Sequence, residues 1–196
     1  MSIMKKLAAG GLLLLTLLMP GLARAEDEDA PMETGTPFEI TSPSAILTEA
    51  STGRVIFEKN ADERRPVASV TKVMTILLTL EAIDEGRIGE NDSVPVSAHA
   101  ASMGGSQAFL DANQSYPLRE LLKSVIIASA NDSAVALAEY IDGTEETFVR
   151  RMNERAQELG LTNTHYVNCN GLPAQDHYMS ARDVAALSAK LDEHPL

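Results

Sequence analysis

The sequence predicts an α+β fold in which a cluster of helices packs against an antiparallel sheet. Three observations lead to this prediction: a β-hairpin pattern early in the chain, five helical patterns after it, and no other obvious strand. About 170 residues follow a predicted signal segment, which suits one domain with its own core. We therefore expect a single α+β domain, with the reservation that a hairpin alone makes a marginal sheet.

Residues 1–25 have the layout of a secretory signal peptide. Lys5 and Lys6 form a basic region, residues 12–19 are almost all apolar, and Ala23-Arg24-Ala25 is a cleavage pattern. The apolar run is too short for a comfortable membrane span. We expect cleavage near Ala25 and an extracytoplasmic protein, whether secreted, periplasmic or on the cell-wall face.

Residues 26–37 (EDEDAPMETGTP) read as a disordered acidic leader, so the domain is expected at 38–196. The formal charge of −12 becomes three units more negative when the signal peptide is removed with its three basic residues. So acidic a chain is not expected to bind nucleic acid or anionic lipid.

The cysteine and histidine content argues against disulfides and metals. The single cysteine, Cys169, excludes an internal disulfide. A reactive thiol is possible at this position, but a small, partly buried structural residue is the favoured reading. The four histidines are widely scattered without ligand spacing, so we expect no metal and no cofactor.

The hairpin is predicted from two apolar stretches separated by turn residues. The stretches are residues 45–47 (AIL) and 55–57 (VIF), and Ser51-Thr52-Gly53 lies between them. Gly53 most simply supplies the positive φ that the turn requires.

The first helix is predicted from Val70 until Gly86 stops it. Apolar residues recur at positions 70, 73, 74, 77, 80 and 83, while Ile76 and Leu78 fill the other face. A helix that is apolar all round is usually central and buried.

Four more helices follow. They are predicted at about 118–128, 133–141, 145–159 and 180–191. Gly160 ends the third of these in the manner of a glycine C-cap. Ser180 opens the last one with a spacing like that of a capping box.

The first helix begins with Ser69-Val70-Thr71-Lys72, an S-x-x-K pattern. One such match is expected by chance in a chain of this length, and the plain reading is a serine cap with a solvated lysine. In the alternative interpretation Ser69 is a nucleophile. Residues 69 and 72 share a helix face, so the Lys72 amine can reach the Ser69 oxygen, and the N–H groups at the helix start stabilise negative charge there. Burial would lower the pKa of Lys72 and let its neutral amine act as the base.

The second candidate feature is Ser129-Ala130-Asn131, in a short loop between two helices. One explanation is a helix cap, since Asn131 or Asp132 would suit the helix that begins near Ser133. The other is chemical, because the loop presents a hydroxyl that can relay a proton and a carboxamide that can hold a peptide backbone.

With these motifs together, the chain resembles the low-molecular-mass penicillin-binding proteins that act as serine D-alanyl-D-alanine carboxypeptidases (peptidase S11-like). It is most similar to the secreted, sporulation-type members. The resemblance runs from about residue 45 to 191, through AILTEASTGRVIFEKNADERRPVASVTKVMT, LLKSVIIASANDSAVALAEYI and RMNERAQELGLTNTHYVNCNGLPAQDHYMSARDVAALS. It implies a β-lactamase/transpeptidase-like fold.

The resemblance also implies roles for the motif residues. Ser69 would be acylated with Lys72 as general base, Ser129 would pass the proton to the leaving amine, and Asn131 would contact the substrate amide. The implied reaction removes the terminal D-Ala from peptidoglycan stem peptides without a cofactor. β-Lactams would acylate the same serine. Met103-Gly104-Gly105-Ser106 looks like the family's loop beside the cleft, although a plain turn is an equally fair reading.

One family motif is missing from the sequence. No Lys-Thr-Gly tripeptide occurs, and Ser51-Thr52-Gly53, the nearest string, lies in the predicted hairpin turn and lacks the cation. In the family this motif contacts the substrate carboxylate, and its strand supplies an oxyanion N–H. We therefore expect an N-terminal part of a carboxypeptidase that lacks the C-terminal strands and membrane anchor, with little activity when expressed alone.

Two alternatives remain. A class A β-lactamase would need a deacylating glutamate in E-x-x-L-N, and Glu158-Leu159-Gly160-Leu161-Thr162 only approaches that pattern. A non-catalytic protein that binds peptidoglycan or penicillin fits the missing Lys-Thr-Gly, but the intact Ser69, Lys72, Ser129 and Asn131 argue against it.

Overall fold

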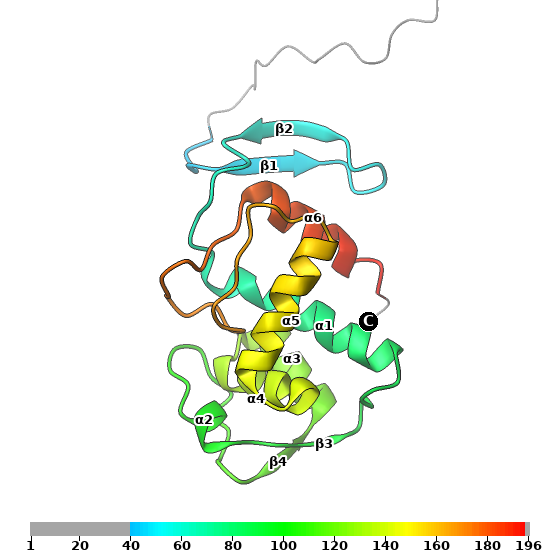
Figure 1. Ribbon diagram of the computed structural model, residues 1–196, viewed down its shortest axis with the longest axis vertical. Coiled ribbons are helices and arrows are strands. Elements are labelled where there is room, and N and C mark those ends of the chain that lie inside the picture. Colours follow the sequence, from blue (N-terminus) through cyan, green and yellow to red (C-terminus); the bar gives the residue numbers. More distant parts are fainter. Residues whose placement is uncertain (1–39, 195–196) are drawn as a thin grey trace, which may run out of the picture. The chain divides into compact units, whose positions relative to one another are not determined.

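The computed structural model describes residues 40–194, all within one unit of the chain. The predicted signal peptide and acidic leader lie outside the described residues. Two strands lead into the helices, and a second, shorter pair of strands occurs among them (Figure 1).

The predicted hairpin is confirmed. Strands β1 (Ala45–Thr48) and β2 (Val55–Lys59) pair antiparallel, with Leu47 opposite Phe57. Gly53 has φ +73° and its N–H donates to the Glu49 carbonyl at 2.8 Å, so this glycine supplies the left-handed turn residue as predicted.

The central helix begins differently from the prediction. Residues Ala68–Thr71 form a 3₁₀ turn, η1, and α1 then runs over Lys72–Asp84. No side chain caps the N-terminus of η1 or of α1, so the alternative interpretation of Ser69 as a helix cap is wrong. Nine of the 13 residues of α1 are buried, which confirms a helix that is apolar all round and central.

Three of the later helices lie where the sequence predicts them. These are α3 (Leu118–Ala128), α5 (Glu145–Glu158) and α6 (Ala181–Leu191). Gly160 follows α5 with φ +71°. Ser180 Oγ accepts the Asp183 N–H at 3.1 Å, so the predicted cap of α6 is confirmed.

Helix α4 (Asn131–Asp142) begins two residues before the predicted start at Ser133. Its N-cap is Ala130, which makes no side-chain cap bond, so neither Asn131 nor Asp132 caps the helix. The physical reason is that both side chains bond instead to a loop at residues 103–110.

Three short elements were not predicted. Strands β3 (Ser93–Pro95) and β4 (Ser115–Pro117) form a second antiparallel pair, and α2 (Ala98–Ala101) is a single helical turn. Elements of three or four residues are too short to display a hydrophobic period.

Figure 1 shows the hairpin β1–β2 at one end of the described part, the pair β3–β4 at the other, and the helices between them. Helix α6 contacts both β1 and α1, and α4 contacts α1, α3 and α5. The α+β prediction is confirmed, with two small antiparallel sheets. None of the helices in residues 40–194 is both long and apolar enough to cross a bilayer.

Candidate active site

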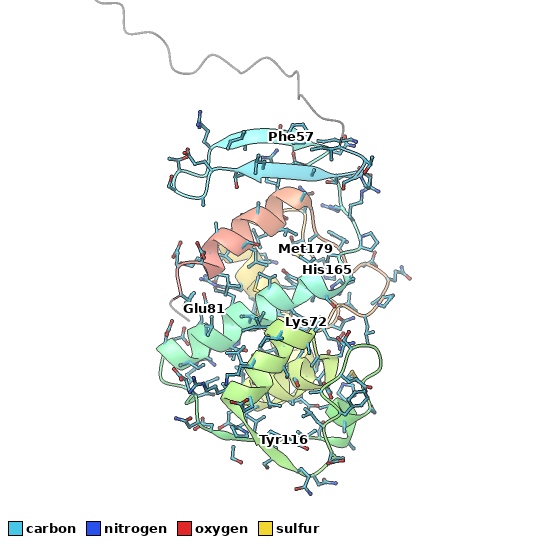
Figure 2. All side chains as sticks on the ribbon, turned by 180° about the vertical axis from the view of Figure 1, so that it is seen from behind. Phe57, Lys72, Glu81, Tyr116, His165 and Met179 are labelled. Carbon is cyan, nitrogen blue, oxygen red and sulfur yellow. The ribbon has the colours of Figure 1, made fainter. Side chains whose placement is uncertain are left out.

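The 3₁₀ turn and the first residue of α1 bring a hydroxyl and an amine together. Lys72 Nζ donates to Ser69 Oγ at 3.1 Å. Ser69 is exposed, whereas Lys72 is only 2% exposed, inside the helical cluster seen in Figure 2. Burial lowers the pKa of the Lys72 amine and outweighs an opposing effect of Cys169. A neutral amine this close to an exposed hydroxyl can accept its proton.

A backbone carbonyl holds the lysine from the other side. Lys72 Nζ donates to Asn170 O at 2.6 Å, across 98 residues of sequence. The sequence prediction missed this partner. The only local sign is the turn-forming string Asn168-Cys169-Asn170-Gly171, in which Asn168 Oδ1 accepts the Gly171 N–H at 2.7 Å.

Gly171 packs directly on the peptide that precedes the serine. Its φ is +87°, and an added Cβ would overlap the carbonyl oxygen of Ala68. Ala68 itself has φ +44°, an uncommon value for a residue with a side chain. The backbone on both sides of this contact is therefore tightly specified, and it positions Ser69.

His177 bonds to the 3₁₀ turn η1 that carries Ser69. Val167 N–H donates to His177 Nδ1 at 3.1 Å, and His177 Nε2 lies 2.7 Å from Thr71 Oγ1. Because Nδ1 accepts, the proton of the neutral ring is on Nε2 and is donated to the threonine. Burial lowers the pKa of His177, with a smaller contribution from His165.

Ser129 lies at the C-terminal end of α3 in a left-handed conformation, with φ +56° and ψ +35°. Its Oγ is buried and has no hydrogen-bond partner among residues 40–194. Such an atom is unusual in a folded protein and is typical of a site that a ligand or water completes. No hydrogen bond joins it directly to Ser69 or Lys72 in the described residues.

Asn131, the first residue of α4, holds the glycine-bearing loop. Its Nδ2 donates to Gly104 O at 2.7 Å, and its backbone N–H donates to Ser106 O at 2.7 Å. The next residue, Asp132, is fully buried and accepts the N–H groups of Ala108 and Leu110 at 2.9 and 3.1 Å. The loop is therefore an ordered part of the site.

The same loop reaches the segment that holds the lysine. Asn170 Nδ2 lies 3.5 Å from Met103 Sδ, and the position of a Cβ on Gly105 would be 2.9 Å from Asn131 Nδ2 and 3.9 Å from Leu172 Cδ2. The loop at residues 103–106 thus bridges Asn131 and the Asn170 segment. The candidate residues belong to one neighbourhood, and among them in residues 40–194 the side-chain hydrogen bond is between Lys72 and Ser69.

The chemistry that this neighbourhood offers is nucleophilic. It contains an exposed hydroxyl, a buried amine of lowered pKa, a second hydroxyl that has no hydrogen-bond partner in the described part of the chain, and a carboxamide. Within residues 40–194 no cluster of three or more histidine, cysteine or acidic side chains could hold a metal ion. An acyl-transfer reaction needs the first two of these groups as nucleophile and base.

Comparison with known families gives a match over most of the chain. A family model described as D-alanyl-D-alanine carboxypeptidase (peptidase S11) matches residues 30–195. Among curated relatives, D-alanyl-D-alanine carboxypeptidase DacF of Bacillus subtilis (strain 168) is 51% identical over 148 residues. That match covers 76% of this chain and 38% of the relative.

Solved structures of related proteins are similar to this chain in fold as well. The D-alanyl-D-alanine carboxypeptidase DacD from Francisella tularensis is 37% identical with a TM-score of 0.77, and the match covers 79% of this chain and 37% of that one. Penicillin binding protein 6B from Escherichia coli is 35% identical with a TM-score of 0.79, covering 84% and 54%. The chain spans about half the length of the proteins it matches, or less.

Proposed function

The chain belongs to the D-alanyl-D-alanine carboxypeptidase family, peptidase S11, and we propose that Ser69 is the nucleophile of a serine carboxypeptidase that acts through an acyl-enzyme. The observation that best supports this role is the 3.1 Å contact between the exposed Ser69 hydroxyl and the buried Lys72 amine. The proposed substrates are peptidoglycan stem peptides that end in D-Ala-D-Ala.

The proposed mechanism begins with proton transfer from Ser69 to the neutral amine of Lys72. The serine oxygen attacks the carbonyl of the penultimate D-Ala, and the positive end of the helix dipole stabilises the negative charge that develops. The protonated Lys72 then gives its proton to Ser129, whose hydroxyl has no partner in the described residues, as Ser129 passes its own proton to the leaving D-Ala amine. Water then hydrolyses the ester, and Asn131 holds the substrate amide throughout.

Covalent labelling with a fluorescent penicillin tests the acyl-enzyme. A β-lactam resembles the D-Ala-D-Ala terminus, so it should acylate Ser69 and form a stable adduct. The Ser69→Ala variant should not label. Ser51→Ala, in the exposed hairpin turn, is the matched control and should label like the wild-type protein. Unlabelled wild-type protein would refute the proposed nucleophile.

We propose that turnover by the 196-residue chain is weak, because Lys-Thr-Gly is absent from it. Loss of one oxyanion donor costs roughly a hundredfold or more in rate. D-Ala release from a pentapeptide by the purified chain should therefore be close to background. Release at the rate of a complete carboxypeptidase would contradict this. Wild-type protein that binds its ligand but does not label with penicillin would favour the alternative of a non-catalytic binding protein.

The location of Glu158 argues against the β-lactamase alternative. Glu158 is exposed and pairs at 2.9 Å with Arg155, which also binds Glu81 at 2.6 Å. Figure 2 shows Glu81 and Lys72 toward opposite ends of α1. At 1.5 Å per residue their Cα atoms are about 13.5 Å apart along the helix axis. Because Glu158 shares Arg155 with Glu81, this geometry supports a carboxypeptidase rather than a class A β-lactamase.

We also propose an extracytoplasmic location, where peptidoglycan is found. The apolar stretch and A-x-A pattern within residues 1–25 support export. Fusion of residues 1–30 to a reporter that is active only outside the cytoplasm would test this, and an inactive reporter would count against it.

A further inference from the structure

We propose that Glu145, the first residue of α5, is a positioning residue for the catalytic lysine. It fastens the Cys169–Asn170 segment, and the carbonyl of Asn170 then orients Lys72 toward Ser69. The inference rests on the proposed function, since it assigns Glu145 a part in making Lys72 an effective base.

The carboxylate of Glu145 binds on two sides. Its Oε1 accepts the backbone N–H of Cys169 at 3.2 Å and the thiol of Cys169 at 3.3 Å. Its Oε2 lies 2.8 Å from His99 Nε2. The Glu145 side chain is 18% exposed and Cys169 is fully buried, so solvent competes little for the inner contacts.

The fastened segment leads straight to the lysine. The Cys169 carbonyl accepts the Thr75 hydroxyl of α1 at 2.6 Å, and the next carbonyl, that of Asn170, accepts Lys72 Nζ at 2.6 Å. Residues 72 and 75 lie one turn apart on the same face of α1. Glu145 thus binds the N–H side of the Cys169–Asn170 segment, and the carbonyls of the same segment bind side chains on the active-site face of α1.

The orientation matters because a neutral amine must aim its single lone pair at the serine proton. One N–H of Lys72 that donates to Asn170 limits rotation of the amine. A base displaced by about 1 Å loses much of its advantage. Looser attachment of the segment would also admit water around Lys72, and its pKa would rise because burial is what lowers it.

Glu146, the neighbour of Glu145, shows that an acidic residue in the first turn of α5 does not need to bind the Cys169–Asn170 segment. Thr144 Oγ1 caps α5 by accepting the Thr147 N–H at 3.1 Å. Glu146 lies in the same first turn and is exposed, with no ion pair among residues 40–194. Either acid can interact with the helix dipole from there. Only Glu145 reaches the active-site segment, which makes Glu146→Ala a matched control.

The experiment uses the full chain, in which Cys169 is the only cysteine. The rate of Cys169 modification by dithionitrobenzoate reports opening of the fastened segment. In Glu145→Ala we expect modification about tenfold faster, the factor that follows from losing one hydrogen bond to a charged group. Glu145→Gln keeps an oxygen acceptor and should restore most of the protection. Glu146→Ala should match the wild-type rate.

The second readout is the pH profile of acylation by fluorescent penicillin. In Glu145→Ala the rate should fall and its rising limb should move to higher pH, while Glu145→Gln and Glu146→Ala keep the wild-type profile. If the role of Glu145 were merely structural, Glu145→Ala would lower the melting temperature without shifting the rising limb of the pH profile. The Gln variant also keeps the test decisive if the Ala variant folds poorly.

Three results would overturn the proposal. They are equal thiol reactivity in Glu145→Ala and Glu146→Ala, faster thiol reaction with an unchanged acylation profile, and no rescue by Glu145→Gln. Failure of the wild-type protein to label with penicillin would instead refute the proposed function. The thiol measurement would then still decide whether Glu145 fastens the segment.

Discussion

Gly171 is the glycine of the candidate site whose surroundings leave least room for a side chain. Its φ of +87° already strains any other residue, and a Cβ would overlap the Ala68 carbonyl. Gly143 has a similar φ of +82° but nothing within 4 Å of the added atom. Alanine at Gly143 would therefore introduce backbone strain alone, whereas alanine at Gly171 would add a steric clash next to the nucleophile.

We predict that Gly171→Ala is the more damaging of the two substitutions. Gly143→Ala should cost about 1 kcal/mol of unfolding free energy through backbone strain alone. Gly171→Ala should cost at least about 2 kcal/mol more and abolish penicillin labelling, because the peptide before Ser69 must shift. Urea unfolding and labelling of both variants provide the measurement, and equal costs would contradict the predicted contact.

His177 makes stability depend on pH at the same turn. Burial lowers its pKa in the folded state, so the unfolded state binds the proton more readily. Its contribution to stability is complete above the unfolded histidine pKa of about 6.5 and is lost as the pH falls below that value. Protonation of Nδ1 would also break the bond from Val167 N–H.

We therefore predict a lower urea midpoint at pH 5 than at pH 7.5. His177→Gln should be less stable overall, because it loses the bonds to Thr71 and Val167. It should also show a flatter pH dependence over this interval. An unchanged slope in the variant would assign the effect to other groups.

At the scale of elements, helix ends decide how the active-site segments are held. Ser180 caps α6 by accepting the Asp183 N–H, and Asp183 Oδ2 in turn accepts the Asn163 N–H at 2.8 Å and the Thr164 hydroxyl at 2.7 Å. The start of α6 is therefore joined to the chain that enters the Asn168–Leu172 segment.

We predict that Ser180→Ala destabilises the protein by about 1 kcal/mol, the usual contribution of a helix cap. Ser188→Ala removes a serine from the exposed side of the same helix, where its hydroxyl only donates to the Val184 carbonyl. That variant should change stability by less than about 0.5 kcal/mol. Thermal unfolding followed by circular dichroism compares the two, and a larger loss in Ser188→Ala would refute the assigned cap.

At the scale of the whole molecule, one buried cluster unites the helices and the strands β3–β4. It includes side chains from α1, α3, α4 and α5, among them Leu77, Leu121, Val135 and Phe148, together with Val94 of β3. Because the site segments rest on this cluster, its packing sets the stability of the site as well as that of the fold.

Two phenylalanines test how far the fold depends on that cluster. Phe148 is fully buried, while Phe109 is 80% exposed. We predict that Phe148→Ala costs about 3–5 kcal/mol of unfolding free energy, because it removes buried apolar area and leaves a cavity. Phe109→Ala should lie within about 0.5 kcal/mol of the wild type. Similar urea midpoints for the two variants would mean that Phe148 lies outside a cooperative core.

The sequence by itself determined the local features of this protein. The hairpin, the boundaries of α3, α5 and α6, and the spacing of Ser69 and Lys72 all depend on residues a few positions apart, which chain geometry brings together. The early start of α4 was missed because Asn131 and Asp132 bond to a distant loop instead of capping the helix.

Only the tertiary structure decided what surrounds the serine and the lysine. The carbonyl of Asn170 meets Lys72 across 98 residues, and Glu145 meets Cys169 across 24. The local pattern around Asn170 indicates a turn, but it does not show that Lys72 is the partner of its carbonyl. These residues are brought together by the packing of buried apolar faces against one another, and that packing depends on the whole chain rather than on any segment of it.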